Sequence, residues 1–285
     1  MKRETILKAT AVFQRYMPCQ QLPEIHQVTV REFERKRSDL VERLQSSQDM
    51  YDAETDDSLM EFIHGEKGDA IIIKKDYFSN ADEEGFADAL WHELGHFVAT
   101  KAEAPELRKF LEENNEDLDI AYGYWFWSEF IAEASSCHVS NEYRKTRPNY
   151  HPENIKWNRQ VFENISCSLS DTLQSIFDRS SIDMFSISHY FAHFLKEDFY
   201  IIYREKYPKD DIVGRSGFTK APFDCIQVMI DLMEKLEEQL KKEEFWIVDE
   251  VWIRELGKQV LKLTDAHLAW MLDDSCDDWN MAVSC

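Results

Sequence analysis

Two histidines and the glutamate that follows the first of them form the strongest chemical signal in this sequence. They lie in the pattern His92-Glu93-Leu94-Gly95-His96. On an α-helix, residues i and i+4 are offset by about 40°, so both imidazoles project from one face about one turn apart. That separation suits two nitrogen ligands of a single tetrahedral Zn²⁺. Glu93 points near such an ion without binding it, where its carboxylate can take a proton from water.

A catalytic zinc site also needs a third protein ligand and one open position. A third histidine six residues after His96 would complete one spacing, but Ala99 and Ala102 stand where that pattern has glycine and histidine. The other option is a glutamate on a following helix, and we take Glu129 as the third ligand. Glu133 shares its helix face and is expected to accept the remaining N–H of a ligating histidine, although the two glutamates can exchange these roles.

Plainer explanations exist for all of these residues. The histidines can be ordinary helix side chains, and the two glutamates can be solvated carboxylates. Aromatic neighbours of Glu129 (Trp125, Phe126 and Phe130) indicate a partly buried segment, where an unpaired carboxylate would be costly. A closed structural zinc site would often include thiolates, and Cys137 contributes to one only if the fold brings it near the motif.

Stabilisation of an oxyanion would require a further donor. The candidates are His138, Tyr143, His189, Tyr190 and His193. On one continuous helix, Tyr143 lies about 40° around the axis from Glu129, whereas His138 lies about 180° away, so Tyr143 is favoured. His189 and His193 repeat the i, i+4 spacing without the glutamate. They can be core or interface residues, a second metal site, or donors to the zinc site.

A hairpin is expected to precede the motif helix. Two β-prone runs, 59–64 and 70–73, flank a four-residue turn bounded by Gly65 and Gly68. If residues 69–74 form an edge strand, an extended peptide would pair with the segment Ile71, Ile72, Ile73 and Lys74 through its backbone. The alternative is an ordinary internal strand.

The rest of the chain reads as helical, and the predicted class is mainly α with a small β-sheet (α+β). Low Gly and Pro content and many Glu, Lys, Leu and Ala residues favour helices. A polar, proline-containing stretch at 144–153 separates a domain at 1–148, with its core at about 58–143, from a helical domain of unstated role at 149–285. Helices are predicted over 2–17, 31–47, 83–100, 127–143, 154–178, 184–206, 221–243 and 246–272, with a shorter one after Pro105.

The composition excludes several functional classes. The 285 residues include 33 Lys+Arg and 55 Asp+Glu, a formal net charge of −22 that argues against direct nucleic-acid binding. No apolar run reaches the ~20 residues of a membrane span, and the N-terminus has no clean apolar signal region. The six cysteines form no CxxC pair and fit reduced thiols in a cytoplasmic protein.

The motif and its surroundings resemble the gluzincin metallopeptidases. Three segments are similar to the minimal zincin domain of the ImmA/IrrE type. They are the lead-in Gly68-Asp-Ala-Ile-Ile-Ile-Lys, the run Phe86-Ala-Asp-Ala-Leu-Trp-His-Glu-Leu-Gly-His and the downstream Glu129-x-x-Ala-Glu133. The resemblance covers about residues 58–140. It implies a cytoplasmic peptidase with one Zn²⁺ per chain and Glu93 as general base, acting on a protein substrate such as a repressor.

A second function from a different class fits the same sequence. A zincin-like scaffold without activity could use its acidic surface to bind a basic protein partner, for example by DNA mimicry. The intact Glu93 favours the enzyme, because a binding scaffold does not require a carboxylate at that position. The sequence does not define the oligomeric state.

Overall fold

The computed structural model describes residues 3–17, 21–46, 59–78, 83–103, 105–114, 116–146 and 223–271. The described part is mainly helical with a small three-stranded mixed sheet, which confirms the predicted α+β class. The chain divides into two compact units: unit 1 joins Met1–Glu103 to Ser128–Tyr150, and unit 2 joins Ala104–Trp127 to His151–Cys285. The sequence predicts a division after residue 148, and it does not predict the grouping of 104–127 with the C-terminal residues.

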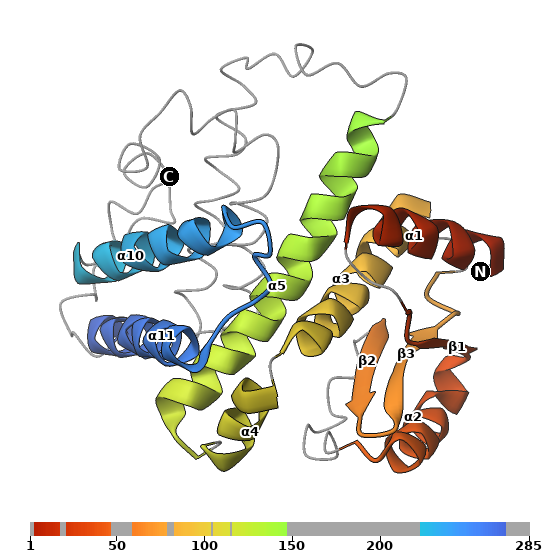
Figure 1. Ribbon diagram of the computed structural model, residues 1–285, viewed down its shortest axis with the longest axis horizontal. Coiled ribbons are helices and arrows are strands. Elements are labelled where there is room, and N and C mark those ends of the chain that lie inside the picture. Colours follow the sequence, from red (N-terminus) through yellow and green to blue (C-terminus); the bar gives the residue numbers. More distant parts are fainter. Residues whose placement is uncertain are drawn as a thin grey trace, which may run out of the picture. The chain divides into compact units, whose positions relative to one another are not determined.

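The sheet of unit 1 has the order β1-β3-β2 (Figure 1). The predicted hairpin is confirmed: β2 (Met60–Gly65) and β3 (Gly68–Lys74) are antiparallel, with Phe62 opposite Ile71. Strand β1 (Glu24–Val28) was not predicted, and it pairs with β3 in parallel. Gly68 has a φ of 136°, a conformation that favours glycine, and this explains its place at the tight turn.

Strand β3 is therefore the central strand, which corrects the expectation of a substrate-binding edge at Ile71, Ile72, Ile73 and Lys74. The backbone of β3 is paired with β1 on one side and β2 on the other, so it has no open edge for a peptide. The three isoleucines are fully buried, as a strand covered on both faces requires. Lys74 is buried as well, with its Nζ 4.4 Å from the centre of the Phe33 ring.

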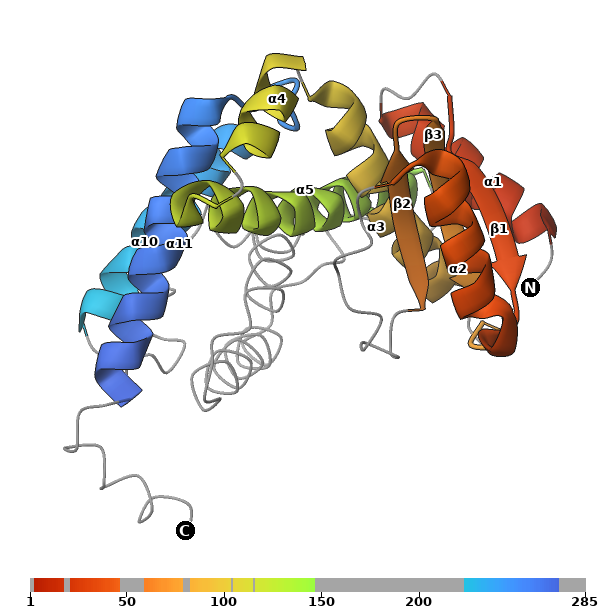
Figure 2. The same cartoon turned by 90° about the horizontal axis from the view of Figure 1, so that it is seen from below.

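Helices cover the two faces of this sheet (Figures 1 and 2). Helix α2 (Val30–Leu44) packs its apolar stripe on one face, where Phe33, Leu40 and Leu44 join Ile63 and Ile72 in one cluster. On the other face, helix α3 (Glu83–Ala102) packs against β2. Helix α1 (Arg3–Tyr16) packs in turn against α3.

Helix α5 (Leu118–Lys145) is one continuous helix of 28 residues. The sequence predicted only its second half, because the aromatic-rich stretch before Trp127 lacks a clear helical period. Its residues up to Trp127 belong to unit 2 and those from Ser128 onwards belong to unit 1.

Unit 2 also contains α4 (Pro105–Glu113), α10 (Phe223–Leu240) and α11 (Glu250–Met271). Helices α5 and α11 meet at two glycines: a Cβ on Gly123 would clash with the Ile253 carbonyl, and one on Gly257 with the Asp119 carbonyl. This close approach also brings Trp127 into edge-to-face contact with Trp252, with ring centres 4.5 Å apart.

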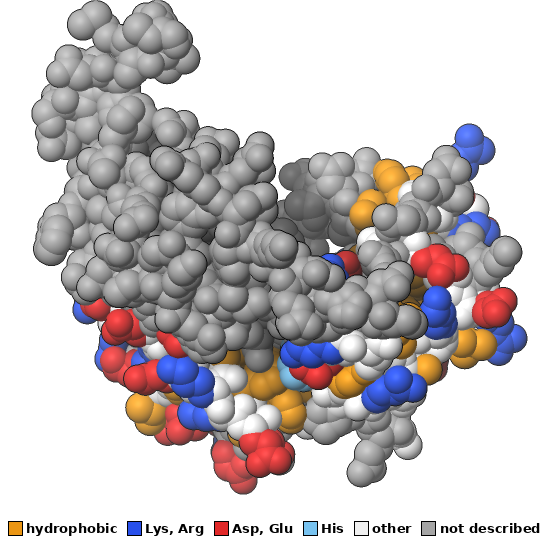
Figure 3. All heavy atoms as spheres, turned by 90° about the horizontal axis from the view of Figure 1, so that it is seen from above, with side chains coloured by type: hydrophobic (Ala, Val, Ile, Leu, Met, Phe, Trp, Pro, Cys, Tyr) orange, Lys and Arg blue, Asp and Glu red, His pale blue; other side chains and the backbone are white. Residues whose placement is uncertain are grey.

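In the described part of the chain, no helix has both the length and the apolar character needed to cross a membrane. The predicted helices 154–178 and 184–206 lie outside the described residues, as do His189, Tyr190 and His193. Acidic and basic side chains are interspersed over the described surface seen in Figure 3.

Candidate metal centre

Helix α3 carries the two motif histidines on its face towards β2 and α5. The helix continues without a break through the motif, so His92 and His96 are one turn apart as predicted. Their Nε2 atoms converge to 3.2 Å, with the ring planes at 86° to each other. Both side chains are largely buried, at 13 % and 14 % exposure.

Glu129 of α5 supplies a third ligand atom. Its Oε2 lies 3.7 Å from the Nε2 of His92 and 3.7 Å from the Nε2 of His96. The circle through three atoms with separations of 3.2, 3.7 and 3.7 Å has a radius of about 2.1 Å, which is a typical Zn–N or Zn–O bond length. His92, His96 and Glu129, here called the metal triad, could therefore hold a metal ion.

The other nitrogen of each histidine is held by α5. His92 Nδ1 is 2.9 Å from Glu133 Oε2, and His96 Nδ1 is 3.1 Å from Ser128 Oγ. A proton on each Nδ1 leaves each Nε2 as a lone-pair donor directed at the triad centre, the tautomer that a metal ligand requires. The structure thus brings Glu133 to its predicted place. Ser128 was not predicted, and its only sequence signal is its position next to Glu129.

Helices α3 and α5 can approach this closely because small residues meet at their crossing. A Cβ on Gly95 would lie only 2.6 Å from the Ala132 carbonyl oxygen. Gly95 lies between Glu93 and His96 in the motif, and Ala132 lies between Glu129 and Glu133. This close contact of the two helices is therefore within the site itself, and it sets the distances among the ligand atoms.

Three carboxylates make the site electrostatically negative. Burial alone would lower the pKa of His92, but the hydrogen bond with Glu133 and the charges of Glu93, Glu133 and Glu129 outweigh it and raise the pKa to about 9. The surroundings thus favour a positive charge between the imidazoles, which either a proton or a metal cation can supply. A divalent cation would replace that proton, because ligating imidazoles must be neutral.

Glu93 follows the first histidine and lies beside the triad without belonging to it. Its carboxylate accepts a hydrogen bond from the backbone N–H of Phe62 in β2. Burial raises the pKa of Glu93 to about 7, with the charge of His92 opposing the rise and the charge of Glu129 adding to it. A carboxyl group with a pKa near neutrality can both accept and release a proton, which is the property of a general acid–base.

Strand β2 forms one wall of the site. The Phe62 ring stacks on the His96 ring, with centres 6.4 Å apart and planes at 6°, and meets the Phe97 ring edge-on at 6.2 Å. In the described part of the sheet, β2 is an edge strand next to the triad. The sequence predicts this position for Ile71 to Lys74, which lie in β3 instead.

Two predicted oxyanion donors are too far from the triad, which corrects both assignments. Tyr143 follows Glu129 by 14 residues on the same straight helix, a rise of about 21 Å, and His138 follows it by nine residues, about 14 Å. Tyr143 shares the helix face of Glu129, but the rise along the axis separates the two side chains. Tyr143 instead contacts Trp91, with ring centres 6.2 Å apart.

Cys137 is buried one turn after Glu133 and is not part of the triad. Its Sγ lies 3.9 Å from Glu133 Oε1, so the thiol contacts the carboxylate that orients His92. Cys137 therefore contacts a residue that orients the site and does not act as a ligand itself. The ligand atoms of the triad are two nitrogens and one oxygen. Such a set with one open position is typical of catalytic zinc sites.

Comparison of the chain with protein-family models, with curated proteins and with solved structures finds no match.

Proposed function

We propose that the chain is a zinc-dependent peptidase, with His92, His96 and Glu129 as metal ligands and Glu93 as general base. The observation that carries the proposal is the convergence of three ligand atoms from two helices on a point about 2.1 Å from each, with both Nδ1 atoms already engaged. A pair of histidines packed for structural reasons alone would not require both rings to point the same nitrogen at one carboxylate oxygen.

The proposed chemistry divides between the ion and the chain. A zinc ion held by three protein ligands supplies Lewis-acid chemistry, polarising a carbonyl and making water reactive near neutral pH. Glu93 takes the proton from the attacking water as the new C–O bond forms. It then delivers that proton to the amine as the peptide C–N bond breaks, so the carboxylate is regenerated. Glu133 and Ser128 hold the two imidazoles in place throughout.

The proposed substrate position follows from the sheet. Because β2 is an edge strand, a peptide in extended form can pair with its outer backbone groups next to the triad. Phe62 has its N–H directed at Glu93 and away from β3, so alternate residues of β2 present their backbone groups to this edge. The segment at Met60–His64 thus takes the role first expected of β3.

The experiment compares wild-type protein with Glu93→Gln on a peptide library, with cleavage read by mass spectrometry and zinc measured in parallel. Glu93→Gln should retain zinc and lose about 10²- to 10⁴-fold in rate, because the amide cannot accept the proton. Glu83→Gln, an exposed glutamate of the same helix, is the matched control and should keep full activity. Equal cleavage by Glu93→Gln and wild type, or no cleavage by zinc-loaded wild type, would contradict the proposal.

A further inference from the structure

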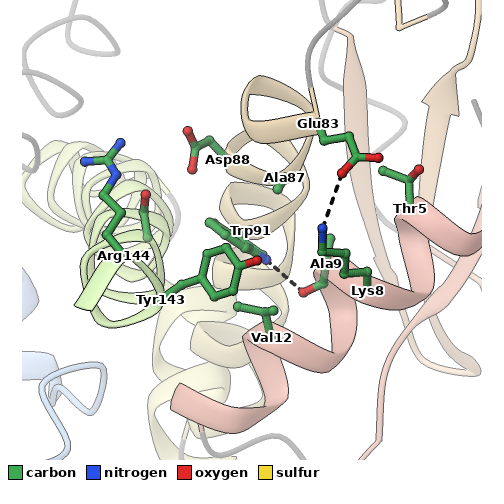
Figure 4. Close-up of a pocket in the computed structure, with 11 residues that line it drawn as sticks. Thr5, Lys8, Ala9, Val12, Glu83, Ala87, Asp88, Trp91, Tyr143 and Arg144 are labelled. Carbon is green, nitrogen blue, oxygen red and sulfur yellow. Dashed lines mark hydrogen bonds and ion pairs between the residues drawn. The ribbon is translucent and has the colours of Figure 1, made fainter. Parts of the chain in front are cut away.

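Unit 1 contains a concave site that the metal chemistry does not use. It is a cavity of about 180 Å³ between α1, α3 and α5 (Figure 4). It lies along the first half of α3, before the motif histidines, and along the last turns of α5. Tyr143, which the sequence assigned to the metal site, lines this cavity instead.

Aromatic and small apolar side chains form the inner wall. Trp91 is 3 % exposed and is fixed by its indole N–H, which donates to the Ala9 carbonyl at 2.9 Å. Tyr143 meets it edge-on, while Val12 and Ala87 complete the apolar lining. A dry apolar cavity of about 150 Å³ is large enough to hold benzene, so this one accepts a single ring with a few more atoms. Nucleotides and larger cofactors are too big.

The rim carries charges of both signs. Asp88 of α3 and Arg144 of α5 lie on one side of the cavity in Figure 4, and the Lys8–Glu83 ion pair, at 3.3 Å, lies on the other. A guanidinium suits a carboxylate, and a carboxylate suits an ammonium group. A ligand that meets Asp88 and Arg144 together would therefore carry both an ammonium and a carboxylate group next to its ring.

We propose that this cavity binds a free aromatic α-amino acid, with the ring against Trp91 and Tyr143, the ammonium at Asp88 and the carboxylate at Arg144. Edge-to-face contact between a bound ring and these aromatic side chains adds binding free energy beyond that of the apolar area buried. The proposal goes beyond the proposed peptidase and does not depend on it, because no residue of the metal triad lines the cavity.

Isothermal titration calorimetry of the full chain with L-phenylalanine tests the proposal. We expect one saturable site with a Kd of about 0.1–1 mM, a range that suits a ligand of this size with an exposed head group. The analogues 3-phenylpropionate, which lacks the ammonium, and 2-phenylethylamine, which lacks the carboxylate, should each bind about 3- to 10-fold more weakly. Metal-depleted protein should bind L-phenylalanine equally well.

Three variants assign the contacts. Ala87→Leu fills the cavity and should abolish binding. Asp88→Asn should weaken the binding of L-phenylalanine and 2-phenylethylamine but not that of 3-phenylpropionate. Arg144→Gln should weaken the binding of L-phenylalanine and 3-phenylpropionate but not that of 2-phenylethylamine. Asp39→Asn, an exposed change on α2, is the matched control and should leave binding unchanged. If Ala87→Leu does not fold, the selectivity of the two charge variants still decides the matter.

Several results would overturn the proposal. These are no saturable heat up to about 10 mM L-phenylalanine, equal binding of benzyl alcohol, tighter binding of L-leucine, and charge variants that affect all three ligands alike. Cleavage assays are not part of this test, so its failure would leave the proposed peptidase function standing.

Discussion

Gly95 of α3 lies directly against the backbone of Ala132 in α5: a Cβ at Gly95 would be 2.6 Å from the Ala132 carbonyl oxygen. A side chain of any size would push the two helices apart at this point. The metal triad takes its histidines from one of these helices and its glutamate from the other. The contact between Gly95 and Ala132 therefore controls the distance from Glu129 to both imidazoles, and so the ability of the site to hold an ion.

The first prediction concerns this contact. Gly95→Ala should destabilise the protein by about 1–3 kcal/mol, since the added methyl group overpacks a backbone contact. It should also weaken zinc binding, because α5 must move away from α3. Gly85→Ala is the matched control: Gly85 is exposed in the same helix, and alanine there should be neutral or stabilising. Thermal unfolding and zinc titration measure both effects, and equal behaviour of the two variants would contradict the prediction.

A second prediction distinguishes two serines of α5, Ser128 and Ser135. Ser128 Oγ holds His96 Nδ1 at 3.1 Å, so Ser128→Ala should weaken zinc binding by about 10-fold or more. Ser135 is fully buried, and its hydroxyl has no hydrogen-bond partner among the described residues, so Ser135→Ala should leave zinc affinity unchanged and not lower stability. Competition with a chromogenic chelator measures both affinities. The prediction is wrong if Ser128→Ala binds zinc as tightly as Ser135→Ala does.

The third prediction concerns the pH dependence of stability. Asp69 is buried at the start of β3 and pairs with His64 and Lys101, each at 2.6 Å. Burial alone would raise the pKa of Asp69, but the hydrogen bonds from His64 and Lys101 and their charges outweigh burial and lower it below the usual 3.8. A lowered pKa in the folded state means that the ionised carboxylate stabilises the fold above the usual pKa, and that this stabilisation is lost as the pH falls below it.

Asp69→Asn should therefore destabilise the protein by about 1–2 kcal/mol at pH 7 and progressively less below about pH 4, where Asp69 becomes protonated in the unfolded wild-type chain before it does in the folded one. Denaturant unfolding at a series of pH values gives the two curves. Asp39→Asn, on the exposed face of α2, is the control and should follow the wild-type curve. A difference between Asp69→Asn and wild type that stays constant down to pH 3 would show that the carboxylate charge is not the cause.

The sequence predicted the parts of the site that follow from local spacing. The i, i+4 histidines, the glutamate between them and the shared face of Glu129 and Glu133 all depend on helix geometry, which a regular period determines. Ser128 could not be found in this way, because a single hydroxyl has no period and its role depends on the crossing of two helices. Tyr143 was misplaced because a helical wheel records the angle around the axis and not the rise along it.

The fold, like the site, could be predicted only where local sequence patterns determine the structure. The hairpin and the helices of unit 1 were visible from alternation, turn residues and apolar periods. Strand β1 has only five residues and a polar sequence, so it depends on its parallel pairing with β3 for its identity as a strand. Without β1, the sequence could not show that β3 is central, and the open edge was therefore assigned to the wrong strand of the hairpin.

The most direct test of the central claim is the zinc content of the purified full chain. Elemental analysis after dialysis should find one zinc per chain for wild type and for Glu142→Ala, a control on the same helix where the glutamate pairs with Lys145. Glu129→Ala removes a ligand and should lower the content well below one. Absence of zinc from the wild-type chain after zinc loading, or a full zinc content in Glu129→Ala, would contradict the metal site on which the proposed function depends.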